Sequence, residues 1–293
     1  MCAWALNDHP DHGDAVAMHL LRAEILLKLE RWYQAEADGE RVADLVLGQM
    51  GKGDVGKKKK KTLSVMLRKA MLISGMACYG RRAWKHAANA FERALQRFTD
   101  SEPFRQGLQM AKARIKETET GVYDWSALHH AAKNEDMTSE IGDYVGPIEE
   151  KDFPGFGKGI IASRDVKAGE FLVVSRALAI IGPNSLELDL KSNRAWLMRI
   201  LGYNHPFPWA WQQTLVYKAY WQPELNKQLQ ALYHGYEEPP RPRFPFRDDT
   251  DYRGKETDPI NAGDMDLVAA FNSFGASVDK PPVGDQNKAW ANK

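Results

Sequence analysis

Three glycines, Gly155, Gly157 and Gly159, follow Pro154 at alternate positions. Glycine has no side chain, so such a run lets backbone groups approach a bound ligand closely. The same run also suits a tight turn between two β-strands. These residues alone are compatible with a ligand-binding turn and with a plain glycine-rich hairpin, because isolated GxG patterns are common.

Two runs of β-type residues flank a polar turn directly after the glycines. They cover residues 159–163 and 170–174, and residues 165–169 lie between them. Apolar β-branched runs on both sides of a short turn with Asp, Lys and Gly are typical of a β-hairpin. We therefore expect these two runs to pair with each other.

The order of these parts resembles the opening of a SET domain. It comprises the GxG turn, a small apolar strand, Asp-Val-Lys-Ala-Gly-Glu at 165–170, a second strand and Ala-Leu-Ala at 177–179. SET domains are protein-lysine methyltransferases that use S-adenosylmethionine as the methyl donor. The resemblance implies that Gly157, Lys158 and Gly159 lie against this cofactor.

A second segment with the same resemblance lies near the C-terminus. Residues 271–275 read Phe-Asn-Ser-Phe-Gly and are similar to the family's Asn-Ser-Phe segment, whose asparagine faces the cofactor. The resemblance therefore adds Asn272 to the expected S-adenosylmethionine site. It also makes a protein lysine the expected substrate.

Two further SET motifs have no counterpart in the chain. No Asn-His-Ser-Cys segment follows Phe274, and no tyrosine follows Tyr252. In the family these motifs complete the cofactor pocket and the channel that aligns the lysine amine with the methyl group, and the transfer depends on that alignment. We expect a SET domain truncated before these motifs and inactive as this chain, and we assign no catalytic residue.

The elements before the glycine-rich segment are predicted to be α-helices, over residues 14–118, because apolar residues recur there at helical spacing. Gly75, Ala87, Phe91 and Ala94 resemble the small and aromatic positions of a tetratricopeptide repeat. The small residues would let paired helices approach closely, and Phe91 would fill the gap between repeats. Stacked repeats of this kind offer a surface for a protein or peptide partner.

The first helix pair shows a weaker version of the same pattern. Ala23, Ala35 and Val42 occupy the corresponding positions, and Gly39 replaces the phenylalanine. Ala35 and Ala87 are 52 residues apart, which equals one repeat of about 34 residues plus roughly 18 inserted residues. An ordinary array of helical hairpins remains the alternative and predicts a similar shape.

A glycine- and lysine-rich stretch at residues 48–62 interrupts the helical pattern and has the size of the inserted residues. It contains five consecutive lysines at 57–61. We interpret it as an exposed loop. A nuclear localisation patch and a docking site for anions are the alternatives.

The remaining chain divides into a junction at 119–142, a partial SET domain at 143–276 and a tail at 277–293 that is expected to be disordered. Gly-Val-Tyr-Asp at 121–124 is similar to the segment that joins repeats and SET domain in fungal-type proteins. A mostly helical stretch at about 188–270 is similar to the insertion of SMYD-type SET domains. The overall expectation is an α+β chain, with a helical array followed by an incomplete β-rich domain.

Composition excludes several functional classes. The net charge of +1 gives no general attraction to nucleic acid or to anionic membranes, and the two cysteines are too few for a zinc site built from three or four cysteines.

Adjacent His129 and His130 point apart on a helix or turn, so we expect surface residues rather than metal ligands. We find no signal peptide and no membrane span, and expect an intracellular protein of the cytoplasm, the nucleus or both.

Two functional hypotheses follow. The first is a protein-lysine methyltransferase of the repeat-plus-SET type that uses S-adenosylmethionine and binds a protein partner through its repeats. The second is a scaffold without enzymatic activity, whose repeats capture a peptide and whose SET remnant is structural. Binding of nucleic acid through residues 57–61 is a weaker third hypothesis and predicts a steep dependence on salt.

Overall fold

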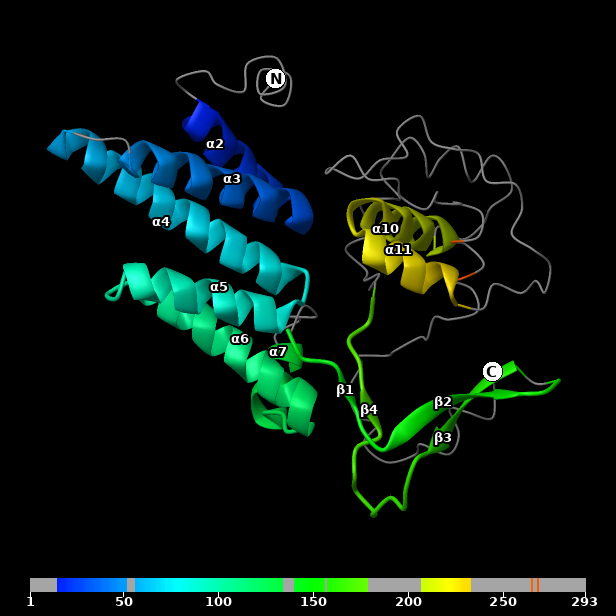
Figure 1. The fold of residues 1–293 in the computed structure, drawn as a ribbon. Helices are drawn as coiled ribbons and strands as arrows, with labels where there is room; N and C mark the ends of the chain where they lie inside the picture. Colours follow the sequence, from blue (N-terminus) through cyan, green and yellow to red (C-terminus); the bar gives the residue numbers. More distant parts are fainter. Residues whose placement is uncertain are drawn as a thin grey trace. The chain divides into compact units, whose positions relative to one another are not determined.

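The computed structural model describes residues 15–51, 56–133, 140–155, 157–178 and 207–232, together with Met265 and Val268. Most of these residues are helical, and a few short strands follow the N-terminal helices (Figure 1). The chain divides into two compact units. The first contains the N-terminal helices and all the described strands, and the second contains two C-terminal helices as far as Tyr220 and from Glu224 onward. No described helix is both long enough and apolar enough to cross a bilayer.

Five helices form the N-terminal array, and each packs against the next along the chain. They are α2 (Ala15–Lys28), α3 (Trp32–Gly51), α4 (Lys57–Gly80), α5 (Trp84–Arg97) and α6 (Glu102–Thr120). The sequence explains several of their ends. Pro103 stands in the first turn of α6, where its missing N–H costs no hydrogen bond. The same helix ends at Gly121, which adopts the left-handed conformation with φ of 65°.

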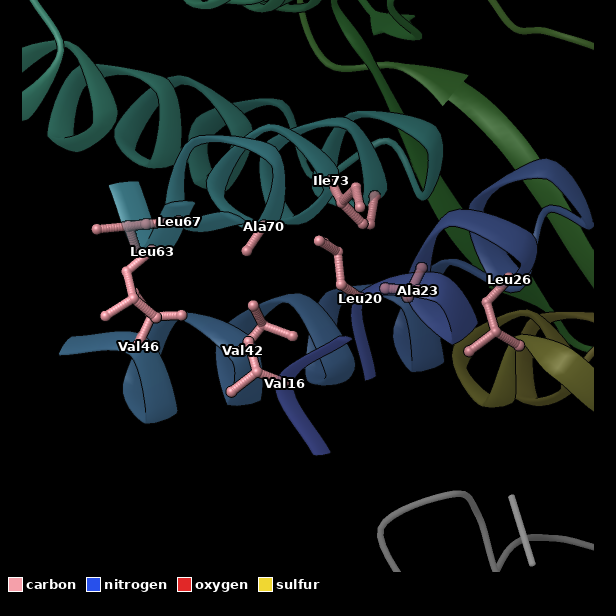
Figure 2. Packing of buried hydrophobic residues seen from close by; sticks show 12 residues of the cluster. Val16, Leu20, Ala23, Leu26, Val42, Val46, Leu63, Leu67, Ala70 and Ile73 are labelled. Atoms are coloured by element: carbon pink, nitrogen blue, oxygen red, sulfur yellow. The ribbon is translucent and has the colours of Figure 1, made fainter. Parts of the chain in front are cut away.

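The core of the first helix pair is built from aliphatic side chains at helical spacing. Figure 2 shows them converging from three helices: Val16 and Leu20 from α2, Val42 and Val46 from α3, and Leu63, Leu67 and Ala70 from α4. Each fully buried valine or leucine contributes about 1.5–3 kcal/mol through the hydrophobic effect. Gly39 brings α3 against the backbone of α4, because a Cβ at this position would lie 3.0 Å from the Ala70 carbonyl oxygen.

Phe91 is the centre of the second core cluster, and its side chain is fully buried. Its ring lies against the backbone of two neighbouring helices, since a Cβ would come within 2.4 Å of the ring at Gly75 and within 2.5 Å at Gly107. The predicted roles of Gly75 and Phe91 in close helix packing are thereby confirmed. The glycines are required because no side chain fits between the ring and either helix.

The turns between paired helices show the 52-residue repeat directly. Before α3, Glu30 has φ of 56° and the N–H of Arg31 donates to the Leu26 carbonyl at 2.9 Å. Before α5, Arg82 has φ of 66° and the N–H of Ala83 donates to the Cys78 carbonyl at 3.0 Å. Every residue of the second turn is 52 positions after its counterpart in the first. Both turns are the same left-handed helix termination.

The structure corrects the predicted lysine-rich loop. Helix α3 continues to Gly51, and residues 57–61 form the first turns of α4, with all five lysines exposed. Lysine is a good helix former when its charge stays in water. The repulsion between neighbouring charges is therefore overcome by the long helix that follows, whose buried face includes Leu63 and Leu67.

The junction contains the short helix α7 (Trp125–Lys133). Asp124 caps it, since the Asp124 carboxylate accepts a hydrogen bond from the Ala127 N–H at 2.9 Å. The chain then returns along α6, where the Gly142 N–H donates to the buried carboxylate of Glu117 at 2.7 Å. The Gly142 carbonyl accepts from the Tyr123 hydroxyl at 2.7 Å.

The strands form two separate antiparallel pairs. Strand β1 (Tyr144–Val145) pairs with β4 (Val173–Val174), and β2 (Ile148–Phe153) pairs with β3 (Gly157–Ala162). The predicted pairing of the first apolar run with the second is therefore wrong. Residues 148–153 escaped prediction because they are mostly charged and exposed, without the apolar alternation that marks a strand. The β-rich half of the α+β expectation is limited, in the described residues, to these short strands.

The second unit contains α10 (Phe207–Trp221) and α11 (Pro223–Gln230) except for Trp221 and Pro223. Both helices agree with the mostly helical stretch predicted there. Leu215, Leu225 and Leu229 are buried. The tail at 277–293 and most of the predicted insertion lie outside the described residues. The predicted domain boundaries remain predictions.

Candidate functional site

The glycine-rich segment is a hairpin loop. Phe153 pairs with Gly157, so residues 154–156 connect β2 to β3. Gly155 has φ of 80°, a conformation that glycine adopts without strain. The turn that the sequence analysis assigned to a ligand is thus also the turn that reverses the chain between two strands.

Gly159 lies under an aromatic ring from the neighbouring strand. A Cβ at residue 159 would come within 2.8 Å of the Phe153 ring. The two residues are diagonal neighbours across the β2–β3 pair, where an aromatic side chain reaches over a glycine on the same face. Close packing of this ring is therefore sufficient to account for the glycine.

Lys158 points to the opposite face of the hairpin and is exposed. Its ammonium group lies 2.5 Å from the carboxylate of Glu150. This hydrogen bond, together with the attraction between the two charges, raises the pKa of Lys158. The structure therefore brings Gly157, Lys158 and Gly159 together on one hairpin, while Asn272 lies outside the described residues.

The polar turn after β3 is held by a second carboxylate. Glu170 forms an ion pair with Arg164 and accepts a hydrogen bond from the Lys167 N–H at 3.1 Å. These two donors, the Arg164 side chain first, lower the pKa of Glu170 to about 2. Gly169 has φ of 84°, which completes the turn. The tight turn predicted at 165–169 is present, although it leads to β4 rather than into a hairpin.

A groove in the helical array is a site that the sequence analysis missed. It has a volume of about 790 Å³ and lies over α4 between α3 and α5. Its lining includes Glu36, Glu40, Ala43, Asp44, Leu47, Met71, Cys78, His86, Ala90, Glu92 and Arg93. Most of these residues lie on α3 and α5, beside the buried apolar positions that the sequence pattern marks. Only the helix packing places these two rows opposite each other over α4.

A buried polar cluster lies at one end of this groove. The Glu36 carboxylate accepts hydrogen bonds from the Cys78 thiol at 3.1 Å and from Arg81 Nη2 at 3.2 Å. Arg81 Nε lies 2.9 Å from the second carboxylate oxygen, outside hydrogen-bond geometry. Arg81 also stacks over the Tyr33 ring, with its guanidinium carbon 5.0 Å from the ring centroid.

Cys78 is not an activated nucleophile. Burial, followed by the hydrogen bond to Glu36, raises the pKa of the Cys78 thiol to about 12. A nucleophilic cysteine requires the opposite shift, because the thiolate is the reactive form. Cys78 therefore acts as a buried thiol donor to Glu36.

No group of three or more metal-ligating side chains occurs in the part of the chain that the structure describes. The His129 and His130 rings, whose centroids are 6.5 Å apart, lie in α7 and are not part of such a group. The candidate sites are thus the β2–β3 hairpin and the groove over α4. No protein-family model, curated protein or solved structure matches this chain.

Proposed function

We propose that the chain joins a protein-binding helical-repeat module to the opening strands of a SET-type protein-lysine methyltransferase that uses S-adenosylmethionine. The repeats hold a protein partner. The location that we propose for this chain is the inside of the cell. The observation that carries the binding function is the groove between α3 and α5. The repeated turns at Glu30 and Arg82 support it, because they make the array a stack of similar helix pairs.

Partner binding is tested by selecting peptides from a displayed random library on the full-length chain. Ala43 lines the groove and is only partly buried, so Ala43→Trp fills the groove from an accessible position. We expect selected peptides to bind the wild type and to lose binding to Ala43→Trp. Melting curves of the wild type and of Ala43→Trp are the control for folding of the array. Peptides that bind both chains equally place the binding surface elsewhere.

The methyltransferase part is supported by the order of motifs from the glycine-rich turn to residues 177–179. Calorimetric titration of S-adenosylmethionine into the full chain tests it. Gly157→Val adds a side chain in β3, next to the loop, and we expect it to abolish saturable binding. Phe153→Ala is the matched control, because it alters the same hairpin but removes atoms instead of adding them. Absence of heat with a folded wild-type chain contradicts this part of the proposal.

A scaffold without cofactor is the second candidate. It is favoured by the Phe153 ring over Gly159, because packing alone then explains the glycine. A chain that binds groove peptides and is indifferent to S-adenosylmethionine supports the scaffold. In either case we expect no methyl transfer by this chain, and a radioactive methyl-transfer assay with lysine-containing peptides measures it.

A further inference from the structure

Carboxylates outnumber guanidinium and ammonium groups in the lining of the groove over α4. Four line it, against one guanidinium, that of Arg93. Three of the four, Glu40, Asp44 and Glu92, are exposed. Glu36 is paired with Arg81, and Glu92 lies 2.9 Å from Lys112 on α6. Asp44 on α3 is exposed and faces the groove. The α3 wall therefore presents negative charge to any segment that enters.

The lining also contains apolar side chains. Leu47 on α3, Met71 on α4 and Ala90 on α5 line the groove, and Leu47 has 41% of its surface exposed. Contact between an apolar side chain and water is unfavourable, so a ligand that covers Leu47 gains free energy of binding. An apolar side chain from a partner fits this position.

We propose that the groove binds an extended protein segment in which an apolar side chain is flanked by lysine or arginine. This inference rests on the proposed function and names the chemistry of the partner. The apolar side chain covers Leu47 and Met71, and the flanking cations meet the carboxylates of α3, with Asp44 foremost. Complementary charge of this kind selects partners and excludes acidic segments, which the walls repel.

The chain's own basic stretch does not reach its own groove. Residues 57–61 open the same helix, α4, that forms the groove floor from Met71 onward. A helix rises about 1.5 Å per residue, so Lys61 stays roughly 15 Å from Met71 along a rigid axis. The carboxylates of the lining favour a basic segment, and we take it to belong to a separate protein; a second copy of this chain is an outcome that the experiment distinguishes.

Fluorescence anisotropy with the full-length chain tests the proposal. The probe is a labelled peptide with one leucine flanked on both sides by lysines, and the matched probe replaces the lysines with glutamates. We expect the lysine peptide to bind at least about tenfold more tightly than the glutamate peptide, and Asp44→Lys to remove that difference. Glu149→Lys, which reverses an exposed charge on β2, is the control and should leave both affinities unchanged.

Leu47→Ser tests the apolar contact separately. We expect it to lower the affinity for the lysine peptide without raising the affinity for the glutamate peptide. Equal binding of both peptides overturns the inference on charge but leaves peptide binding standing. Binding of neither peptide, together with failure of the displayed library, overturns the proposed function as well. A different outcome is self-association of the chain, with Asp44→Lys and Lys58→Glu each abolishing the association. That result identifies a second copy of the chain as the occupant and overturns the inference of a separate partner.

Discussion

Glu30 and Arg82 share one backbone conformation in two turns that are 52 residues apart, with φ of 56° and 66°. Neither is glycine, and a residue with a Cβ pays roughly 1–2 kcal/mol in this left-handed region. Glu30 is exposed, whereas Arg82 forms an ion pair with Asp143 at 2.8 Å and donates to the Ile141 carbonyl at 3.3 Å. The same strain is thus kept in two different surroundings.

Replacing each residue by glycine should therefore change the free energy of unfolding differently. Glu30→Gly relieves the strain and is expected to stabilise the chain by up to about 1 kcal/mol, after the entropy that glycine adds to the unfolded chain. Arg82→Gly relieves the same strain but breaks the contacts to the 141–143 segment, so its net change should be zero or destabilising. Urea unfolding measures both. Equal effects of the two substitutions contradict the assigned role of Arg82.

Phe91 should be the most sensitive position of the second helix pair. Phe91→Ala is expected to lower the free energy of unfolding by about 3–5 kcal/mol, because it leaves a cavity between α4 and α6. Gly75→Ala is expected to cost about 1–3 kcal/mol by overpacking, and less when combined with Phe91→Leu. Asn89→Ala, exposed on the same helix, is the control for urea unfolding. Additive losses from Gly75→Ala and Phe91→Leu argue against direct contact.

The first turn of α4 should tolerate charge reversal. Five lysines lie at the positive end of the helix dipole, and the first turn contains no acidic residue. Lys57→Glu and Lys58→Glu are each expected to stabilise the chain by roughly 0.3–1 kcal/mol at low salt, with a smaller gain at high salt. Thermal melts at two ionic strengths measure this. Lys57→Gln is the control, because it removes repulsion between lysines without adding a negative charge. If Lys57→Glu and Lys58→Glu destabilise the chain, the result argues against a helix that begins at this point.

Cys78 should make stability fall at alkaline pH. An unfolded cysteine has a pKa of about 8.5, whereas burial and Glu36 raise the pKa of folded Cys78 to about 12. The folded state therefore keeps its proton, and this contribution is full below about pH 8.5 and is lost as the pH rises toward 12. Burial also raises the pKa of Tyr79, which acts in the same direction.

Cys78→Ser isolates the thiol, because the hydroxyl still donates to Glu36 but does not titrate in this range. Urea unfolding between pH 8 and 10.5 should show a shallower decline for the variant than for the parent. In a Cys2→Ser background, the remaining thiol should react with a disulfide reagent at pH 8 only after unfolding. Rapid reaction of the folded chain is incompatible with a buried thiol of raised pKa.

The contact between Phe153 and Gly159 separates packing from cofactor binding. Gly159→Ala should weaken hydrogen-exchange protection of the β2–β3 amides, since its Cβ meets the Phe153 ring. In a Phe153→Ala background the same substitution should have little effect on protection. A cofactor requirement at residue 159 gives a different result, because titration of S-adenosylmethionine would then fail in both backgrounds.

The sequence by itself determined the helical array, its 52-residue register and the close packing at Gly75 and Phe91. These features follow from local apolar periodicity and from small residues at fixed spacing, which act over one or two helices. It also located the glycine turn and the polar turn at 165–169, because glycine with positive φ marks such turns wherever the chain folds back.

Only the tertiary structure decided which strands pair and where a groove opens. The β2 strand is charged and exposed, so no alternation marked it, and its pairing with β3 depends on the short loop at Gly155. The groove depends on the spacing of α3 and α5 over α4, which no single helix encodes. Long-range pairing and helix spacing are set by contacts between segments far apart in the chain, and local patterns carry little information about them.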